Sequence, residues 1–139
     1  MSAQDISRKP RQAAPAARPL SPHLQVYRPN LTMVMSILHR ITGVVLYFAT
    51  FVGVWWLMGL ASGPKYFAYV DAMFRSWPGL IILFAVSYQL FHHALGGIRH
   101  LFWDADYGFS VRAAERMGLI SLILAIAATA LVWILGWMT

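Results

Sequence analysis

The stretch ITGVVLYFATFVGVWWLMGLA, residues 41–61, decides the fold because it contains no Asp, Glu, Lys or Arg. About 20 apolar residues in a helix, at about 1.5 Å per residue, span the roughly 30 Å hydrocarbon core of a bilayer. Two further blocks, residues 79–98 and 117–138, have similar lengths and also lack these four residue types. Because a bilayer offers no water to unpaired backbone groups, the three blocks predict transmembrane helices rather than a small barrel.

The composition agrees with this interpretation. The chain has 139 residues, 59% of them hydrophobic and 12% charged, whereas soluble domains carry about 25% charged residues. We therefore expect an all-α integral membrane protein, with a tail and an extended interfacial segment at residues 1–30 and a three-helix anchor domain at residues 31–139. The spans are expected at about 31–60, 79–102 and 114–138. A short interfacial helix is expected at residues 66–74, among aromatic residues that suit a membrane interface.

Local signals mark the start of the first helix. Three prolines keep residues 18–30 out of a continuous helix, because each proline biases its predecessor away from the α region. Asn30 is the expected N-cap. The helix that follows is longer than the hydrocarbon core, so its first third should lie at the membrane interface. That third carries Ser36, His39 and Arg40.

Basic residues are distributed unequally over the two sides of the membrane. Those before the first span are Arg8, Lys9, Arg11, Arg18 and Arg28. Those around the link between the second and third spans are Arg99, Arg112 and Arg116. The other side has Lys65 and Arg75. The positive-inside rule therefore predicts a cytoplasmic N-terminus, or a matrix N-terminus in a mitochondrial protein.

The residue types exclude several classes of function. The net charge of +6 follows the topology and forms no basic stripe with interleaved aromatic residues, so no nucleic-acid partner is expected. The chain has no cysteine, which excludes disulfides, thiolate metal sites and covalent haem attachment through C-x-x-C-H. A haem in this protein would have to be held by His or Met.

Ionisable residues at membrane depth are functional hypotheses by default. Helical periodicity places His93, Gly97, His100 and Asp104 on one stripe of the second span, with Gly96 beside it. An imidazole at this depth, with glycines that leave room for a flat macrocycle, suits an axial ligand of a b-type haem. The alternative is that the imidazole makes an interhelical hydrogen bond and the glycines allow close helix packing.

The neighbouring His92 points about 100° away from His93, so the two side chains cannot bind the same face of one iron. The shared stripe with the glycines favours His93, and His92 is expected to contact another helix or the lipid. His39 and His100 are expected near the cytoplasmic surface. A second axial histidine would therefore come from another subunit.

Two polar residues of the first helix suggest quinone chemistry. Ser36 and Arg40 lie one turn apart, and a quinone needs hydrogen-bond donors at its carbonyl oxygens and two protons on reduction. The permanent charge of Arg40 would favour the anionic semiquinone, and Asp104 is a candidate proton relay. The alternative is that Arg40 binds lipid headgroups while Ser36 bonds to its own backbone.

Three segments together resemble a known family. They are RPLSPHLQVY at residues 18–27, MSILHRITG at 35–43 and HALGGIRHLFWD at 93–104. They resemble the large cytochrome b anchor subunit of succinate dehydrogenase, in its α-proteobacterial and mitochondrial form. The resemblance covers residues 18–139 and implies a bacterial inner membrane protein, with the mitochondrial inner membrane as the alternative.

The resemblance also implies roles for individual residues. His93 would be one axial ligand of a single haem b, and a histidine of a small hydrophobic anchor subunit would be the other, within a heterodimeric helical bundle. The residues implied around the haem and its propionates are His39, Gly97, Arg99 and His100. Those implied at the ubiquinone site are Ser36, Arg40 and Asp104.

The implied function is ubiquinone reduction in a succinate:ubiquinone oxidoreductase. A flavoprotein with covalent FAD and an iron–sulfur subunit would be partners, since this chain has no cysteine for clusters and would not oxidise succinate alone. Two alternatives remain at this stage. One is a fumarate reductase anchor that uses menaquinol, and the other is a structural membrane tether without haem.

Overall fold

The computed structural model describes residues 28–138, and within them the chain forms four helices. The helices are α1 (Leu31–Ala61), α2 (Pro64–Phe74), α3 (Trp77–Asp104) and α4 (Val111–Met138). Three of them, α1, α3 and α4, are long and apolar enough to cross a membrane. Of the segment at residues 18–30 that was expected to be non-helical, residues 28–30 are described and lie outside any helix, and residues 18–27 lie outside the described residues.

The predicted N-cap of the first helix and the predicted short helix that follows it are both confirmed. Asn30 has an extended backbone, and its side-chain oxygen accepts a hydrogen bond from the backbone N–H of Met33 at 3.0 Å. The short helix expected at residues 66–74 is α2, which begins two residues earlier at Pro64, where a proline at the first helical position loses no hydrogen bond. Gly63 precedes it with a φ of 98°, a conformation that favours glycine.

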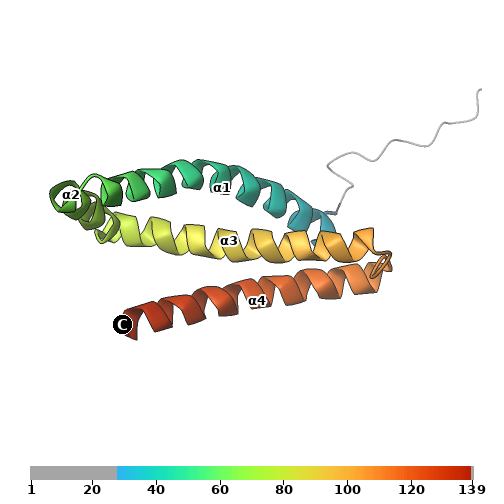
Figure 1. Cartoon of the computed structure of the whole chain (residues 1–139). Coiled ribbons are helices and arrows are strands. Elements are labelled where there is room, and N and C mark those ends of the chain that lie inside the picture. The colour runs from blue at the N-terminus through green and yellow to red at the C-terminus, as the bar shows by residue number, and fades with distance from the viewer. Residues whose placement is uncertain (1–27, 139) are drawn as a thin grey trace, which may run out of the picture.

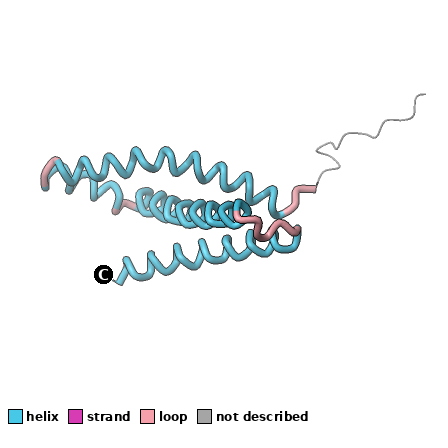
Figure 2. Tube along the Cα trace, turned by 45° about the vertical axis from the view of Figure 1, so that its right-hand side comes forward, coloured by secondary structure: helices cyan, strands magenta, loops and turns pink. Residues whose placement is uncertain are grey.

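The three long helices form one layer, with α3 between α1 and α4 (Figures 1 and 2). The α2 helix lies across the end of α1 and α3, where its buried Val70 packs against Gly59 of α1. Small residues of α4 form its buried face, which is typical of close helix packing in membranes. They are Gly118, Ser121, Ala125 and Thr129. Both hydroxyls of this face donate to carbonyl oxygens of α4 itself.

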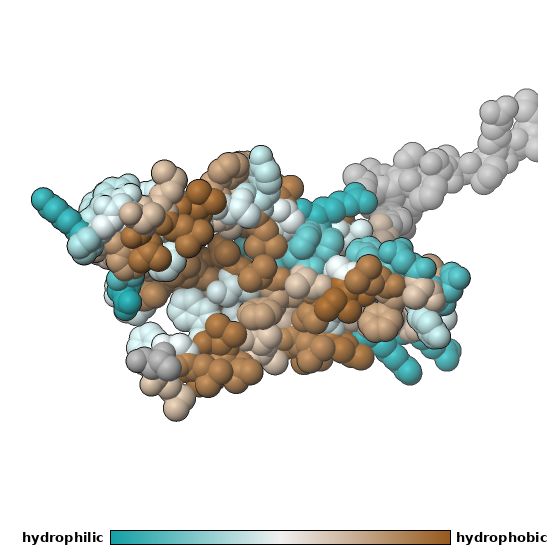
Figure 3. Space-filling model, in the orientation of Figure 1, coloured by the Kyte–Doolittle hydropathy of each residue, from teal (hydrophilic) through white to brown (hydrophobic). Residues whose placement is uncertain are grey.

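Most large apolar side chains face outward. Among residues 28–138, the buried hydrophobic residues are Met35, Val70 and Ala125. Figure 3 shows an apolar surface over the middle of the long helices, with hydrophilic residues toward the two ends of the layer. An apolar surface of this extent requires lipid or protein around it rather than water. The chain is an all-α integral membrane protein, as predicted.

Candidate functional site

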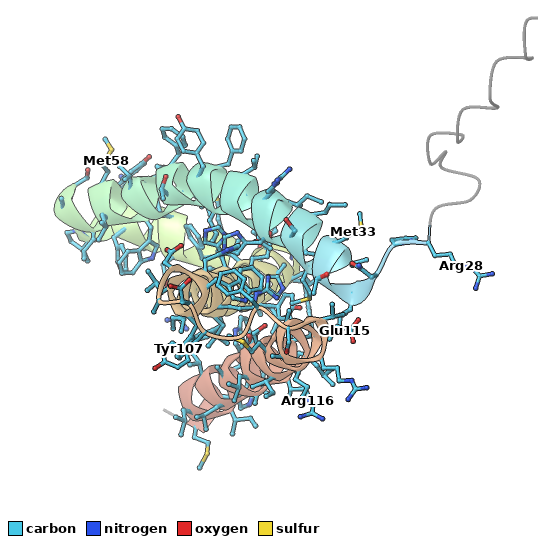
Figure 4. The ribbon with its side chains drawn as sticks, turned by 90° about the vertical axis from the view of Figure 1, so that its right-hand side faces the viewer. Arg28, Met33, Met58, Tyr107, Glu115 and Arg116 are labelled. Atoms are coloured by element: carbon cyan, nitrogen blue, oxygen red, sulfur yellow. The ribbon has the colours of Figure 1, made fainter. Side chains whose placement is uncertain are left out.

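Polar residues of the three spans gather at the end of the layer where α1 begins, α3 ends and α4 begins. Figure 4 looks onto this end, where Arg28, Glu115 and Arg116 lie. The three spans contact one another near this end. Arg99 of α3 lies against Gly118 of α4, and a Cβ at that glycine would be 3.2 Å from Arg99 Nη1 and 3.6 Å from Met35 Cγ of α1.

Two histidines from different helices stack at this end. The imidazole rings of His39 on α1 and His93 on α3 have centroids 4.0 Å apart and an interplanar angle of 11°. The Nε2 of His39 donates to the carbonyl oxygen of His93 at 3.2 Å, and the Nδ1 of His93 donates to the carbonyl oxygen of His39 at 3.1 Å. Each ring therefore bonds the backbone of the opposite helix.

Glycines make room for both rings. A Cβ at Gly43 of α1 would lie 2.9 Å from Cε1 of His93, and a Cβ at Gly96 of α3 would overlap the ring of His39. The space at Gly96 is thus filled by a histidine of this chain. At Gly97, by contrast, a Cβ would have no heavy atom within 4 Å. Of the two adjacent glycines, Gly97 is therefore the one with open space beside it.

The hydroxyl of Thr42 completes the contact between the two helices. It donates to the carbonyl oxygen of His39 at 2.9 Å and lies 3.2 Å from Nδ1 of His93. Nδ1 of His93 also lies 3.1 Å from the carbonyl oxygen of His39, which can only accept a hydrogen bond. Nδ1 therefore carries the proton, and the neutral ring keeps a lone pair on Nε2. Within residues 28–138, Nε2 of His93 has no hydrogen-bond partner.

A third histidine joins the pair. His100 lies two helical turns beyond His93 on α3. Its ring centroid is 5.2 Å from that of His39 and 5.0 Å from that of Trp103. The structure therefore places His39 of α1 beside His93 and His100, which the sequence predicted to share one stripe of α3. The residues that sequence reasoning missed are Thr42, Gly43 and Trp103. Thr42 and Gly43 end the segment at 35–43, but nothing in their spacing indicates which helix they contact.

His92 and Arg99 are buried along a different line of α3, with only 2% and 3% of their surfaces exposed. The ring centroid of His92 is 5.8 Å from that of Tyr88, and the guanidinium of Arg99 is 5.1 Å from the ring of Trp103. Within the described residues, neither nitrogen of His92 has a hydrogen-bond partner, nor do Nε and Nη1 of Arg99. His92 is thus enclosed by this chain rather than placed at its lipid surface.

The other three candidate residues are Ser36, Arg40 and Asp104. Ser36 is half-buried and Arg40 is exposed, one turn further along α1. Asp104 is exposed at the last residue of α3. No hydrogen bond or ion pair joins these three side chains within residues 28–138. The same part of the chain contains no group of three or more acidic, His or Cys side chains that could enclose a metal ion.

This arrangement defines a class of protein: a three-span membrane subunit with a histidine cluster at one end of its helices. The chain belongs to the succinate dehydrogenase/fumarate reductase transmembrane subunit family, whose sequence model matches residues 14–132. This finding confirms the resemblance seen in the sequence.

Individual relatives agree with the family. The chain is 41% identical over 117 residues to the succinate dehydrogenase cytochrome b556 subunit of Rickettsia felis, covering 84% of this chain and 91% of the relative. It is 46% identical over 99 residues to the protein of the same name from Paracoccus denitrificans, covering 71% and 76%. It is 33% identical over 113 residues to the mitochondrial cytochrome b560 subunit of succinate dehydrogenase from Sus scrofa, covering 78% and 66%.

Proposed function

We propose that this chain is the cytochrome b anchor subunit of a succinate:ubiquinone oxidoreductase, which binds one haem b together with a partner subunit and forms part of the ubiquinone site. One observation carries the haem assignment. The Nδ1 of His93 is held by the carbonyl oxygen of His39 at 3.1 Å, so Nε2 is the nitrogen left to bind iron. Histidines that bind metals typically donate their other ring N–H in this way.

The surroundings of His93 fit a haem. Gly97 leaves open space one turn away, and the ring of His100, which lies against that of His39, can donate a hydrogen bond to a haem propionate. The buried guanidinium of Arg99 has two nitrogens without an acceptor in the described chain, and a carboxylate would satisfy them. A bound b-type haem would supply one-electron redox chemistry at this end of the spans.

The second axial ligand is a histidine of a small hydrophobic anchor subunit. His39 and His100 are not suited to this role, because the ring of His39 is stacked on His93 and bonded to its carbonyl oxygen, and His100 packs edge-on against His39. The exposed apolar faces of α1 and α3 give the partner a surface on which to pack.

Ser36, Arg40 and Asp104 serve the quinone. The hydroxyl of Ser36 is a donor for a quinone carbonyl oxygen, and Arg40 supplies charge that stabilises a developing anion. Asp104 is exposed at the end of α3, where it can pass protons from the aqueous side. No hydrogen bond or ion pair joins these side chains within residues 28–138, which is consistent with a site that the partner subunits complete.

The distribution of basic residues favours an orientation with the N-terminus and the α3–α4 link on the cytoplasmic side of a bacterial inner membrane. The histidine cluster then faces the side on which a flavoprotein with FAD and an iron–sulfur subunit dock. The iron–sulfur subunit holds the clusters, because this chain has no cysteine to bind them, and the flavoprotein holds the FAD.

Purification of the complex from its native membrane tests the proposal. We expect three partner chains to copurify, a b-type α band in the reduced spectrum, and succinate-dependent reduction of ubiquinone. A haem-free tether would give the partner chains without the α band. The matching family also includes fumarate reductase subunits, and faster turnover of the reconstituted complex with menaquinol and fumarate would assign it to that direction instead.

A further inference from the structure

Two apolar grooves meet at the end of the spans opposite the histidine cluster. The larger one, of about 710 Å³, lies between α1, α2 and α3 and extends along the spans to Val45 and Val86. The smaller one, of about 460 Å³, lies between α3 and α4 beside Trp133 and Trp137. Both volumes fall within the range of about 300 to 1,000 Å³ that is typical of ligand sites.

The two grooves share two residues, Arg75 and Leu80. Leu80 belongs to the first turns of α3 and separates one groove from the other. Arg75 lies between α2 and α3, two residues before the first residue of α3. The two apolar grooves therefore share one end, and that end carries the positive charge of Arg75.

The guanidinium of Arg75 is only partly used by the chain. Its Nε donates to Asp71 at 2.6 Å, and its side chain is 78% exposed. Within the described residues, its two terminal nitrogens have no hydrogen-bond partner. A guanidinium with two free nitrogens matches the oxygens of a phosphate group.

We propose that Arg75 and these two grooves bind one diacyl phospholipid, with its phosphate at Arg75 and one acyl chain in each groove. A transmembrane helix, about 10 Å wide, would fill one groove but not both, because α3 lies between them. A phospholipid has two apolar chains joined just below one phosphate, which is the layout of the site. The carboxylate of Asp71 adds a place for the ammonium of an ethanolamine headgroup.

Lipid titration followed by native mass spectrometry tests this site. The protein is extracted with any chains that copurify, stripped of lipid, and titrated with phosphatidylethanolamine or with diacylglycerol of the same acyl chains. We expect one phosphatidylethanolamine to bind tightly and diacylglycerol to bind weakly. Arg75→Gln should weaken phosphatidylethanolamine about tenfold, the usual effect of losing a charge-assisted hydrogen bond. Lys65→Gln, which removes the other basic residue of this end, should change nothing.

Substitutions that fill each groove test the binding of the acyl chains separately from the binding of the phosphate by Arg75. A Cβ at Gly53 or Gly136 meets no heavy atom within 4 Å, and the two glycines line the larger and the smaller groove respectively. Gly53→Phe and Gly136→Phe should each weaken phosphatidylethanolamine binding. The control is Ala127→Phe, which adds the same ring to an exposed position of α4 outside both grooves.

Two results would overturn the proposal. The first is unchanged phosphatidylethanolamine binding in Arg75→Gln and in both groove-filling variants. The second is a photoreactive amino acid at position 53 that crosslinks to another polypeptide rather than to lipid. The lipid assay does not depend on haem or quinone, so its result is independent of the proposed electron-transfer function.

Discussion

His39 and His93 exchange hydrogen bonds, each ring donating to the carbonyl oxygen of the other residue across the α1–α3 interface. This relationship fixes more than helix packing. Because the Nδ1 of His93 is the donor, the lone pair of the neutral ring is on Nε2, the nitrogen that would bind iron. The backbone of α1 thus sets the tautomer of a ring on α3.

Replacement of the proposed iron ligand is the first test. His93→Leu removes Nε2 and should abolish the b-type α band, because a leucine side chain has no atom that can bind iron. The measurement is a reduced-minus-oxidised spectrum of the purified complex, normalised to covalent flavin. An α band of unchanged position and amplitude would rule out His93 as the ligand.

The adjacent histidine is the matched control. His92 is 2% exposed and lies beside Tyr88, on a different line of α3. His92→Leu should keep the full haem content and the same spectrum, because the substitution replaces an unpartnered buried imidazole with an apolar side chain. Loss of haem in this variant, with haem retained in His93→Leu, would exchange the two assignments.

The hydroxyl of Thr42 should stabilise the α1–α3 contact. Thr42→Val preserves the shape of the side chain but removes a bond to the carbonyl oxygen of His39 and a contact with Nδ1 of His93. We expect a loss of about 1 kcal/mol in the free energy of unfolding, since interhelical hydrogen bonds in membranes contribute about 0.6 to 2 kcal/mol. Denaturation in mixed micelles measures this loss. Thr42→Ser should restore most of it, and equal stability of the Val and Ser variants would contradict the role of the hydroxyl.

Ser36 and Arg40 should affect quinone reduction without affecting succinate oxidation. Ser36→Ala should lower succinate-to-ubiquinone activity about tenfold, and Arg40→Leu by a larger factor because hydrogen bonds to charged groups are stronger. Reduction of a soluble dye by succinate, which bypasses the quinone site, should stay at the level of the unmodified complex. A parallel fall in both activities would indicate failed assembly rather than a quinone defect.

The sequence was sufficient to predict the three spans, the Asn30 cap and the short helix after α1, because these depend on hydropathy and local backbone chemistry. The helix of the second span, α3, includes Asp104, which the sequence placed on the stripe of His93. The length of an apolar run predicts the part of a helix that crosses the hydrocarbon core, but the helix can continue beyond that run into the polar interface.

The histidine cluster was predictable only in part. His93 and His100 share a stripe by periodicity alone, but the stacking of His39 on His93 depends on how α1 is rotated against α3. That rotation is set by Gly43 and Gly96, each of which leaves space for a ring of the opposite helix. In the sequence, Gly96 and Gly97 look equivalent, whereas in the structure one is filled by His39 and the other is open.

This difference leads to the last prediction, which concerns Gly96. A Cβ at Gly96 would overlap the ring of His39, so Gly96→Ala must push α1 away from α3 or turn the ring out of its stack. We expect a destabilisation of about 1 to 3 kcal/mol, as for other overpacked interiors. Gly53→Ala is the matched control, because it makes the same change in a long helix where a Cβ meets no atom within 4 Å. Both variants share the intrinsic preference of alanine for helix, so the difference between their unfolding free energies reports the contact with His39. If Gly96→Ala were as stable as Gly53→Ala, the rings would not be packed as described, and the fixed tautomer of His93 would lose its structural basis.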